Sequence, residues 1–109
     1  MTHSDFSILL DRRIELIKQT LDSKSKEYST DEDKLHNFKE ASKVSGEHPA
    51  KCLQGFVLKH LVSYFDMLNQ IQQGKKFDRK YLDEKFGDII NYFILQEAIF
   101  VEYGIVNLP

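Results

Sequence analysis

Three polar residues near the C-terminal end of the chain have the spacing of a metal site. Glu84, Asp88 and Asn91 are four and then three positions apart, so they share one face if this stretch is helical. Asp88 and Asn91 flank the centre of an apolar stretch, residues 89–95, where an unpaired carboxylate would be costly. Two carboxylates and an amide oxygen suit Mg²⁺ or Mn²⁺, so Glu84 and Asp88 are the predicted metal ligands. The pattern leaves one alternative open: Glu84 pairs with a surface lysine, and Asp88 with a lysine or histidine of a neighbouring helix.

A second polar group lies in the middle of the chain and could hold phosphate. Lys59, Ser63, Asp66 and Gln70 share one face by the same arithmetic, and His60 is one position further round. A lysine and a histidine suit phosphate oxygens, and Asp66 could complete the cation site as a third ligand. The alternative is an exposed helix face beside an interior histidine, and for this row taken alone we favour that interpretation.

A third group offers an amide for contact with a base. Asn37 shares a face with Asp33 and Glu40, so its side chain could meet a base edge or face solvent. Asn91 is the other amide that we assign to base or sugar contacts. The sequence leaves open whether Asn37 or Asn91 makes this contact.

Composition and motifs exclude several other chemistries. The five glycines are dispersed, so no phosphate-binding loop of the Walker or dinucleotide type is present. Cys52 is the single cysteine, which excludes an intrachain disulfide and suits a reducing cytoplasm. The net charge of -2 argues against general nucleic-acid binding, and no apolar stretch approaches the ~20 residues that span a bilayer. We therefore expect a cytoplasmic protein that does not enter a membrane.

Four helices are expected to position these side chains. The first covers about residues 5–28, with Arg12 and Arg13 on its solvated face. The second starts at Ser29 or Thr30, either of which can cap a helix, and stops near Gly46. The stripe of the first is Phe6, Leu10, Ile14, Ile17 and Leu21, and the second carries Leu35, Phe38 and Ala41 inward.

The third and fourth helices have clear signals at their ends. Pro49 suits the first turn of the third helix, and Gly74 follows its last turn. Asp78 can cap the fourth helix, which runs to about Tyr103 and is apolar nearly all round at its centre. We therefore predict one all-α domain over residues 1–109, built like a four-helix bundle with the fourth helix most buried. The stripe of the third helix is Leu53, Val57, Leu61, Tyr64, Leu68 and Ile71.

The apolar surface of the last two helices exceeds what one bundle can cover. Apolar residues of the fourth helix point in two directions, and aromatic residues of the third lie off its stripe. Uncovered apolar surface usually marks an interface, so we expect a two-fold homodimer. The alternative is a monomer in which the first helix covers the patch. The surplus residues are Ile89, Ile90, Phe93, Ile94, Val101, Phe56 and Phe65.

Two stretches together carry a resemblance to a known family. One is Lys-Glu-Tyr at residues 26–28 followed by Asp-Glu-Asp-Lys-Leu-His-Asn-Phe-Lys at residues 31–39. The other is Glu-Lys-Phe-Gly-Asp-Ile-Ile-Asn-Tyr-Phe-Ile-Leu at residues 84–95. With Lys59-His60 between them, they resemble small phage and prophage proteins related to the MazG-like all-α nucleotide pyrophosphohydrolases.

This resemblance, which covers about residues 24–102, implies an activity. In that family a helical bundle holds magnesium on acidic residues of two helices, and water attacks the α–β linkage of a nucleoside triphosphate. The resemblance implies that Glu84 and Asp88 are catalytic metal ligands and that Lys59 and His60 contact phosphates. The related enzymes also assemble from paired subunits.

The chain departs from the family pattern at positions that bear on catalysis. Lys85 stands where the family usually has a glutamate, and a pair of glutamates one turn apart is replaced by His60 and Ser63. Fewer carboxylates bind magnesium more weakly. We therefore expect a nucleotide-binding protein, and magnesium-dependent pyrophosphohydrolysis of a (deoxy)nucleoside triphosphate is one hypothesis for its activity. The alternative is a non-catalytic phage accessory protein that binds a nucleotide or a host protein on the same scaffold.

Overall fold

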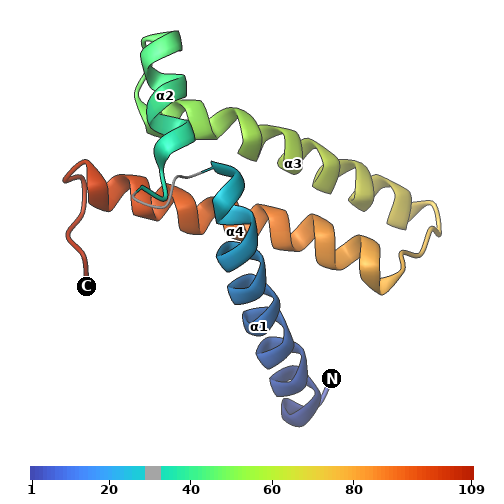
Figure 1. Ribbon diagram of the computed structural model, residues 1–109. Coiled ribbons are helices and arrows are strands. Elements are labelled where there is room, and N and C mark those ends of the chain that lie inside the picture. The colour runs from blue at the N-terminus through green and yellow to red at the C-terminus, as the bar shows by residue number, and fades with distance from the viewer. Residues whose placement is uncertain (29–32) are drawn as a thin grey trace.

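Helices make up the ordered framework of the chain. The computed structural model describes the backbone of residues 1–28 and 33–109, and the side chains of residues 1–22 and 33–109. No strand occurs among these residues, so the predicted all-α fold is confirmed. None of the described helices has the length and apolar character needed to cross a membrane. The helices are α1 (His3–Tyr28), α2 (His36–Ser45), α3 (Pro49–Gln72) and α4 (Arg79–Glu102) (Figure 1).

Local signals set the ends of α3 and α4 as predicted. Pro49 occupies the first turn of α3, where its missing N–H leaves no helical hydrogen bond unmade. The Asp78 carboxylate caps α4 by accepting a hydrogen bond from the backbone N–H of Tyr81 at 2.7 Å. Gly74 and Gly104 follow the two helices with φ of 89° and 72°, a left-handed conformation that suits a residue without a Cβ.

The second helix begins later than predicted. α2 starts at His36, and the predicted capping residues 29–30 lie outside the described part of the chain. Asp33 precedes the helix and accepts a hydrogen bond from the Leu35 backbone N–H at 2.9 Å. Its other carboxylate oxygen lies 2.7 Å from the Lys39 ammonium. Asp33 therefore ties the turn before α2 to the helix itself.

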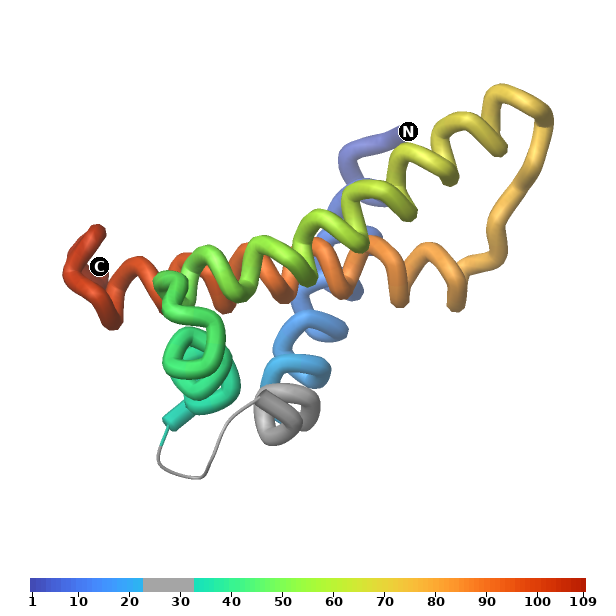
Figure 2. Tube along the Cα trace, turned by 90° about the horizontal axis from the view of Figure 1, so that it is seen from above, coloured from blue at the N-terminus to red at the C-terminus, as the bar shows by residue number. Residues whose placement is uncertain are grey.

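The α3–α4 hairpin is the frame against which α1 and α2 pack. α3 and α4 run antiparallel as a hairpin, whereas α1 crosses α4 and does not lie along it (Figures 1 and 2). α2 packs against α3 and touches α1. The molecule measures 44 × 30 × 24 Å. This elongated shape leaves long stretches of α1 and of the hairpin without a neighbouring helix.

The core lies where α2, the start of α3 and the end of α4 meet. Phe38, Leu53 and Ile99 are 2%, 0% and 0% exposed. Burying an apolar side chain of this size contributes ~1.5–3 kcal/mol of stability. Leu21 packs on the edge of this cluster, and it is the contact of α1 with the core among the described side chains. The other core residues are Leu35, Val57, Tyr92 and Leu95.

Half of the apolar stripe on α1 does not pack. Phe6, Leu10 and Ile14 are 52%, 43% and 43% exposed, while Ile17 and Leu21 are half-buried. Because α1 crosses α4, only the turns at the crossing can touch it, whatever the periodicity of the remaining turns. The alternative in which the first helix covers the apolar surplus of α4 is therefore wrong.

The seam between α3 and α4 also differs from the predicted stripe. Met67 is 3% exposed, whereas Leu68 and Ile71 are 41% and 51% exposed. The residues of α3 that face α4 follow a repeat of 3.5 residues, which keeps two helices in contact along their length. With this repeat, Leu68 and Ile71 of the predicted stripe point away from α4, and His60 points toward it. The inward positions are Leu53, Val57, His60, Tyr64 and Met67.

Candidate functional site

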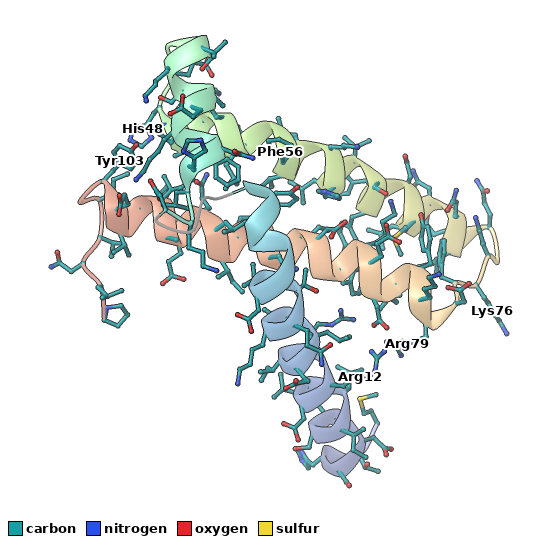
Figure 3. The ribbon with its side chains drawn as sticks, viewed as in Figure 1. Arg12, His48, Phe56, Lys76, Arg79 and Tyr103 are labelled. Carbon is teal, nitrogen blue, oxygen red and sulfur yellow. The ribbon has the colours of Figure 1, made fainter. Side chains whose placement is uncertain are left out.

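Asp83 of α4 ties α1 to α4 near their crossing. Its Oδ1 and Oδ2 accept hydrogen bonds from Nη1 and Nη2 of Arg12 at 2.9 and 2.7 Å. Arg13 Nη2 donates to Oδ1 at 2.8 Å, and Arg13 Nη1 donates to the backbone carbonyl of Asp83 at 3.2 Å. Arg79 lies one turn earlier on α4, 3.8 Å from Oδ1. Figure 3 shows Arg12 and Arg79 on the two sides of this junction.

These arginines stabilise the ionised form of Asp83. The hydrogen bond and charge of Arg12, with the charge of Arg13, lower the pKa of Asp83 from 3.8 to about 2. Burial acts in the opposite direction, because only 17% of the Asp83 side chain is exposed. The Arg13 side chain is 14% exposed, and a buried guanidinium without a carboxylate partner would be strongly destabilising.

A cavity of about 220 Å³ lies beside this junction, between α1 and α4. Its α4 wall includes Glu84, Asp88 and Asn91, the three residues whose spacing predicted a metal site. The structure therefore brings the predicted set to one cavity. The remaining lining residues are Arg13, Leu16, Ile17, Thr20, Asp83 and Gly87.

Asn91 has incomplete hydrogen bonding in this cavity wall. Its side chain is 7% exposed, and its Oδ1 has no hydrogen-bond partner. A buried carbonyl oxygen without a partner costs about 1–3 kcal/mol. A group that donates a hydrogen bond to Oδ1 would recover part of this cost.

His60 reaches the same region from α3. Its Nδ1 lies 4.0 Å from Oδ2 of Asp88, and its ring stacks on Tyr92 with centroids 5.3 Å apart. Phe56 also stacks on Tyr92, with ring centroids 5.6 Å apart. The interpretation that Asp88 meets a histidine of a neighbouring helix agrees with this distance. The stack fixes the His60 ring beside the carboxylate.

Three other predicted site residues lie away from the cavity. Lys59 and Asp66 are exposed on α3, outside its seam with α4. Asn37 is exposed on α2. The structure does not bring these side chains to the cavity wall formed by Glu84 and Asp88.

The cavity wall fits a magnesium ion that arrives with a ligand better than a resident one. Among the described residues, no group of three or more His, Cys, Asp or Glu side chains could hold a metal ion. Glu84 and Asp88 supply two carboxylates, and Asn91 supplies an amide oxygen without a partner. Magnesium is commonly bound by one or two carboxylates together with phosphate oxygens and water. Glu84, Asp88 and Asn91 match the ligands that a protein supplies in such a site.

Sequence reasoning missed Arg13 and Gly87 as parts of the site. We predicted that Arg13 faces solvent, but its side chain faces α4 because α1 crosses α4 near this residue. A Cβ built on Gly87 would lie 3.7 Å from Nη1 of Arg13, so the glycine backbone forms part of the cavity floor. No pattern along α1 signalled this contact, because the position at which α1 crosses α4 is set by tertiary packing.

A second cavity, of about 730 Å³, lies between the start of α2, the end of α4 and the C-terminal tail. Its central cation is Lys39, whose Nζ lies 2.7 Å from Asp33 and 2.6 Å from Glu102. Hydrogen bonds to these two carboxylates raise the pKa of Lys39, so its ammonium stays protonated and their negative charges balance it. The Lys39 ammonium is therefore already paired with two carboxylates in this cavity, which Lys34 also lines.

The α1–α4 cavity combines groups with distinct chemical uses. It offers two carboxylates for a cation and an unsatisfied acceptor for a hydrogen-bond donor, with a histidine next to one carboxylate. No family model, curated protein or solved structure matches the chain.

Proposed function

We propose that this protein binds a nucleoside triphosphate as its magnesium complex at the cavity between α1 and α4. The observation that carries the proposal is the buried Oδ1 of Asn91, which lacks a partner on a wall that also holds Glu84 and Asp88. The resemblance of residues 84–95 to MazG-like nucleotide pyrophosphohydrolases supports a nucleotide as the ligand class. We place this role in the cytoplasm, where Cys52 would remain reduced.

The size of the cavity limits which part of the ligand enters it. Small-molecule sites usually occupy ~300–1,000 Å³, and this cavity has about 220 Å³. It therefore accommodates one moiety, and we assign the metal-bound phosphates to it. The base and sugar lie outside its walls.

The proposed arrangement divides the roles among the three α4 residues. Glu84 and Asp88, one turn apart, coordinate Mg²⁺ or Mn²⁺, and phosphate oxygens and water fill the remaining positions. Asn91 accepts a hydrogen bond from metal-bound water or from a ligand hydroxyl. Without the cation, the two carboxylates would repel the phosphates. Lys59, Asp66 and Asn37 have no role in this arrangement because they lie outside the cavity.

Pyrophosphohydrolysis is the second candidate, favoured by the contact between His60 and Asp88. A histidine oriented by a carboxylate can accept a proton from water. Attack of that water on the α-phosphorus would break the α–β linkage and leave a nucleoside monophosphate and pyrophosphate. The non-catalytic alternative, binding without turnover, uses the same cavity.

A calorimetric titration with the common nucleoside triphosphates and magnesium or manganese tests binding. Asp88→Asn removes a charged ligand of the cation and should weaken binding by about 10-fold or more. Asp66→Asn, an equal change outside the cavity, should leave affinity unchanged. Equal affinities for the wild type and Asp88→Asn would overturn the proposed site, as would the absence of binding to any triphosphate.

Turnover is tested separately by assaying pyrophosphate release by the wild type, Asp88→Asn and His60→Ala. Release that both variants lose supports catalysis at this site. Tight binding without release by the wild type assigns the protein to the non-catalytic alternative. Release that persists in both variants excludes His60 and Asp88 from the reaction.

A further inference from the structure

The side of the α3–α4 hairpin opposite the α1 crossing presents an apolar surface, which we call the hairpin face. Its residues are spaced by three, four and seven along each helix, so they form two adjacent ridges. An apolar cavity lined by Leu61 and Tyr64 of α3 and Phe86 and Ile90 of α4 joins the ridges. The hairpin face consists of Leu58, Leu61, Val62, Phe65 and Leu68 from α3, and Phe86, Ile90 and Phe93 from α4.

This surface gathers large apolar side chains that remain exposed. Val62, Phe65 and Phe93 are 59%, 57% and 54% exposed, and all eight residues of the hairpin face are uncharged. A single aromatic side chain contributes about 150–250 Å² when buried. Eight partly exposed apolar residues therefore amount to a substantial fraction of the ~800 Å² per partner that a stable interface buries.

Two opposite charges border one end of the hairpin face. Lys51 precedes Leu58 by seven residues, and Glu97 follows Ile90 by seven, so each lies on the extension of one ridge. A hydrogen bond of 3.0 Å from Gln96 Nε2 to the Ala50 carbonyl shows that the two positions are level along the hairpin. Lys51 and Glu97 are both exposed.

We propose that two copies of this chain pair through the hairpin face, about a two-fold axis parallel to α3 and α4. Such an axis lays α3 of one copy on α4 of the other, and the four helices then enclose a single apolar layer. Lys51 of each copy meets Glu97 of the other, so the pair forms twice. A two-fold axis perpendicular to the helices would instead lay α3 on α3 and separate these charges. The proposal does not depend on the ligand of the α1–α4 cavity.

Light scattering coupled to size-exclusion chromatography tests the face. The wild type should have twice the chain mass of 12.8 kDa at micromolar concentration. Val62→Glu places a charge in the face and should yield a monomer. Val44→Glu is the matched control, because Val44 is 91% exposed on α2, and it should remain a dimer. Circular dichroism confirms that both variants are folded.

Charge reversal tests the axis. Lys51→Glu and Glu97→Lys should each weaken dimerisation by roughly 3–10-fold, and the double variant should restore it. Lys59→Glu, a reversal elsewhere on α3, should have no effect. A monomeric wild type, or a Val62→Glu protein that still dimerises, overturns the hairpin face as the interface. Single reversals without effect, or a double variant that is not rescued, overturn the parallel axis.

Discussion

At the scale of single residues, Asp83 provides a pH-dependent link between α1 and α4. Its pKa is about 2 in the fold and 3.8 ordinarily, so its contribution is complete above about pH 4 and is lost as the pH falls toward 2. We predict that Asp83→Asn lowers the free energy of unfolding by about 1–2 kcal/mol near neutral pH, a range reduced because Arg12 is half exposed. Urea unfolding across this pH range measures the difference.

The Asp83 prediction has a direct control in Asp66, which is exposed on α3. Asp66→Asn should change the free energy of unfolding little at any pH. If the deficit of Asp83→Asn stays constant from neutral pH to about pH 2, the ion pairs with Arg12 and Arg13 are not its source.

A substitution at Asn91 should change stability and ligand binding in opposite directions. Replacing a buried amide whose oxygen lacks a partner by an apolar side chain of similar size removes an unsatisfied group. We predict that Asn91→Leu raises the free energy of unfolding by about 1 kcal/mol and abolishes stabilisation by a magnesium nucleotide. Thermal unfolding with and without the nucleotide measures both effects, and Asn69→Leu on the exposed side of α3 is the control. A destabilised Asn91→Leu protein would contradict the stability prediction.

At the scale of elements, Gly87 lowers the stability of α4 and leaves the α1–α4 cavity wider than a residue with a side chain would. A glycine inside a helix costs ~0.5–1 kcal/mol relative to alanine, and a Cβ here would meet Arg13 at an ordinary contact distance of 3.7 Å. We predict that Gly87→Ala raises the free energy of unfolding by about that amount. Its methyl group narrows the cavity and should weaken nucleotide binding several-fold, as calorimetry would show.

Gly55 provides the matched substitution on α3. A Cβ at Gly55 meets nothing within 4 Å, so Gly55→Ala should stabilise the protein similarly and leave nucleotide affinity unchanged. Equal affinities for the two alanine variants would place the ligand away from Gly87. A destabilised Gly87→Ala protein would show that the α1–α4 junction cannot take a methyl group.

At the scale of the whole molecule, stability should depend on protein concentration. The core cluster lies at one end of the hairpin, and the hairpin face along its length is exposed. If pairing covers that face, the folded state is stabilised by mass action, and the melting temperature should rise with total protein. Scanning calorimetry over a 100-fold concentration range measures this rise. Val62→Glu should melt at one temperature throughout, and a wild type that does the same would contradict pairing.

The sequence by itself determined the number of helices, the ends of α3 and α4, and part of the candidate site. Pro49 and Asp78 act through the backbone of their own turns, so their effects are readable without any tertiary contact. The spacing of Glu84, Asp88 and Asn91 placed them on one helical face for the same reason, and the structure finds them on one cavity wall. The apolar surplus of the last two helices was also visible as residues beyond one stripe.

Only the tertiary structure decided which residues of different helices meet. Arg13 and Asp83 are 70 positions apart, and their contact depends on where α1 crosses α4. His60 turned toward Asp88, while Asp66 did not, because the hairpin follows a 3.5-residue repeat that the predicted stripe did not follow. Periodicity along one helix shows which of its residues share a face. It carries no information about the angle at which another helix crosses that face, and that angle sets the site.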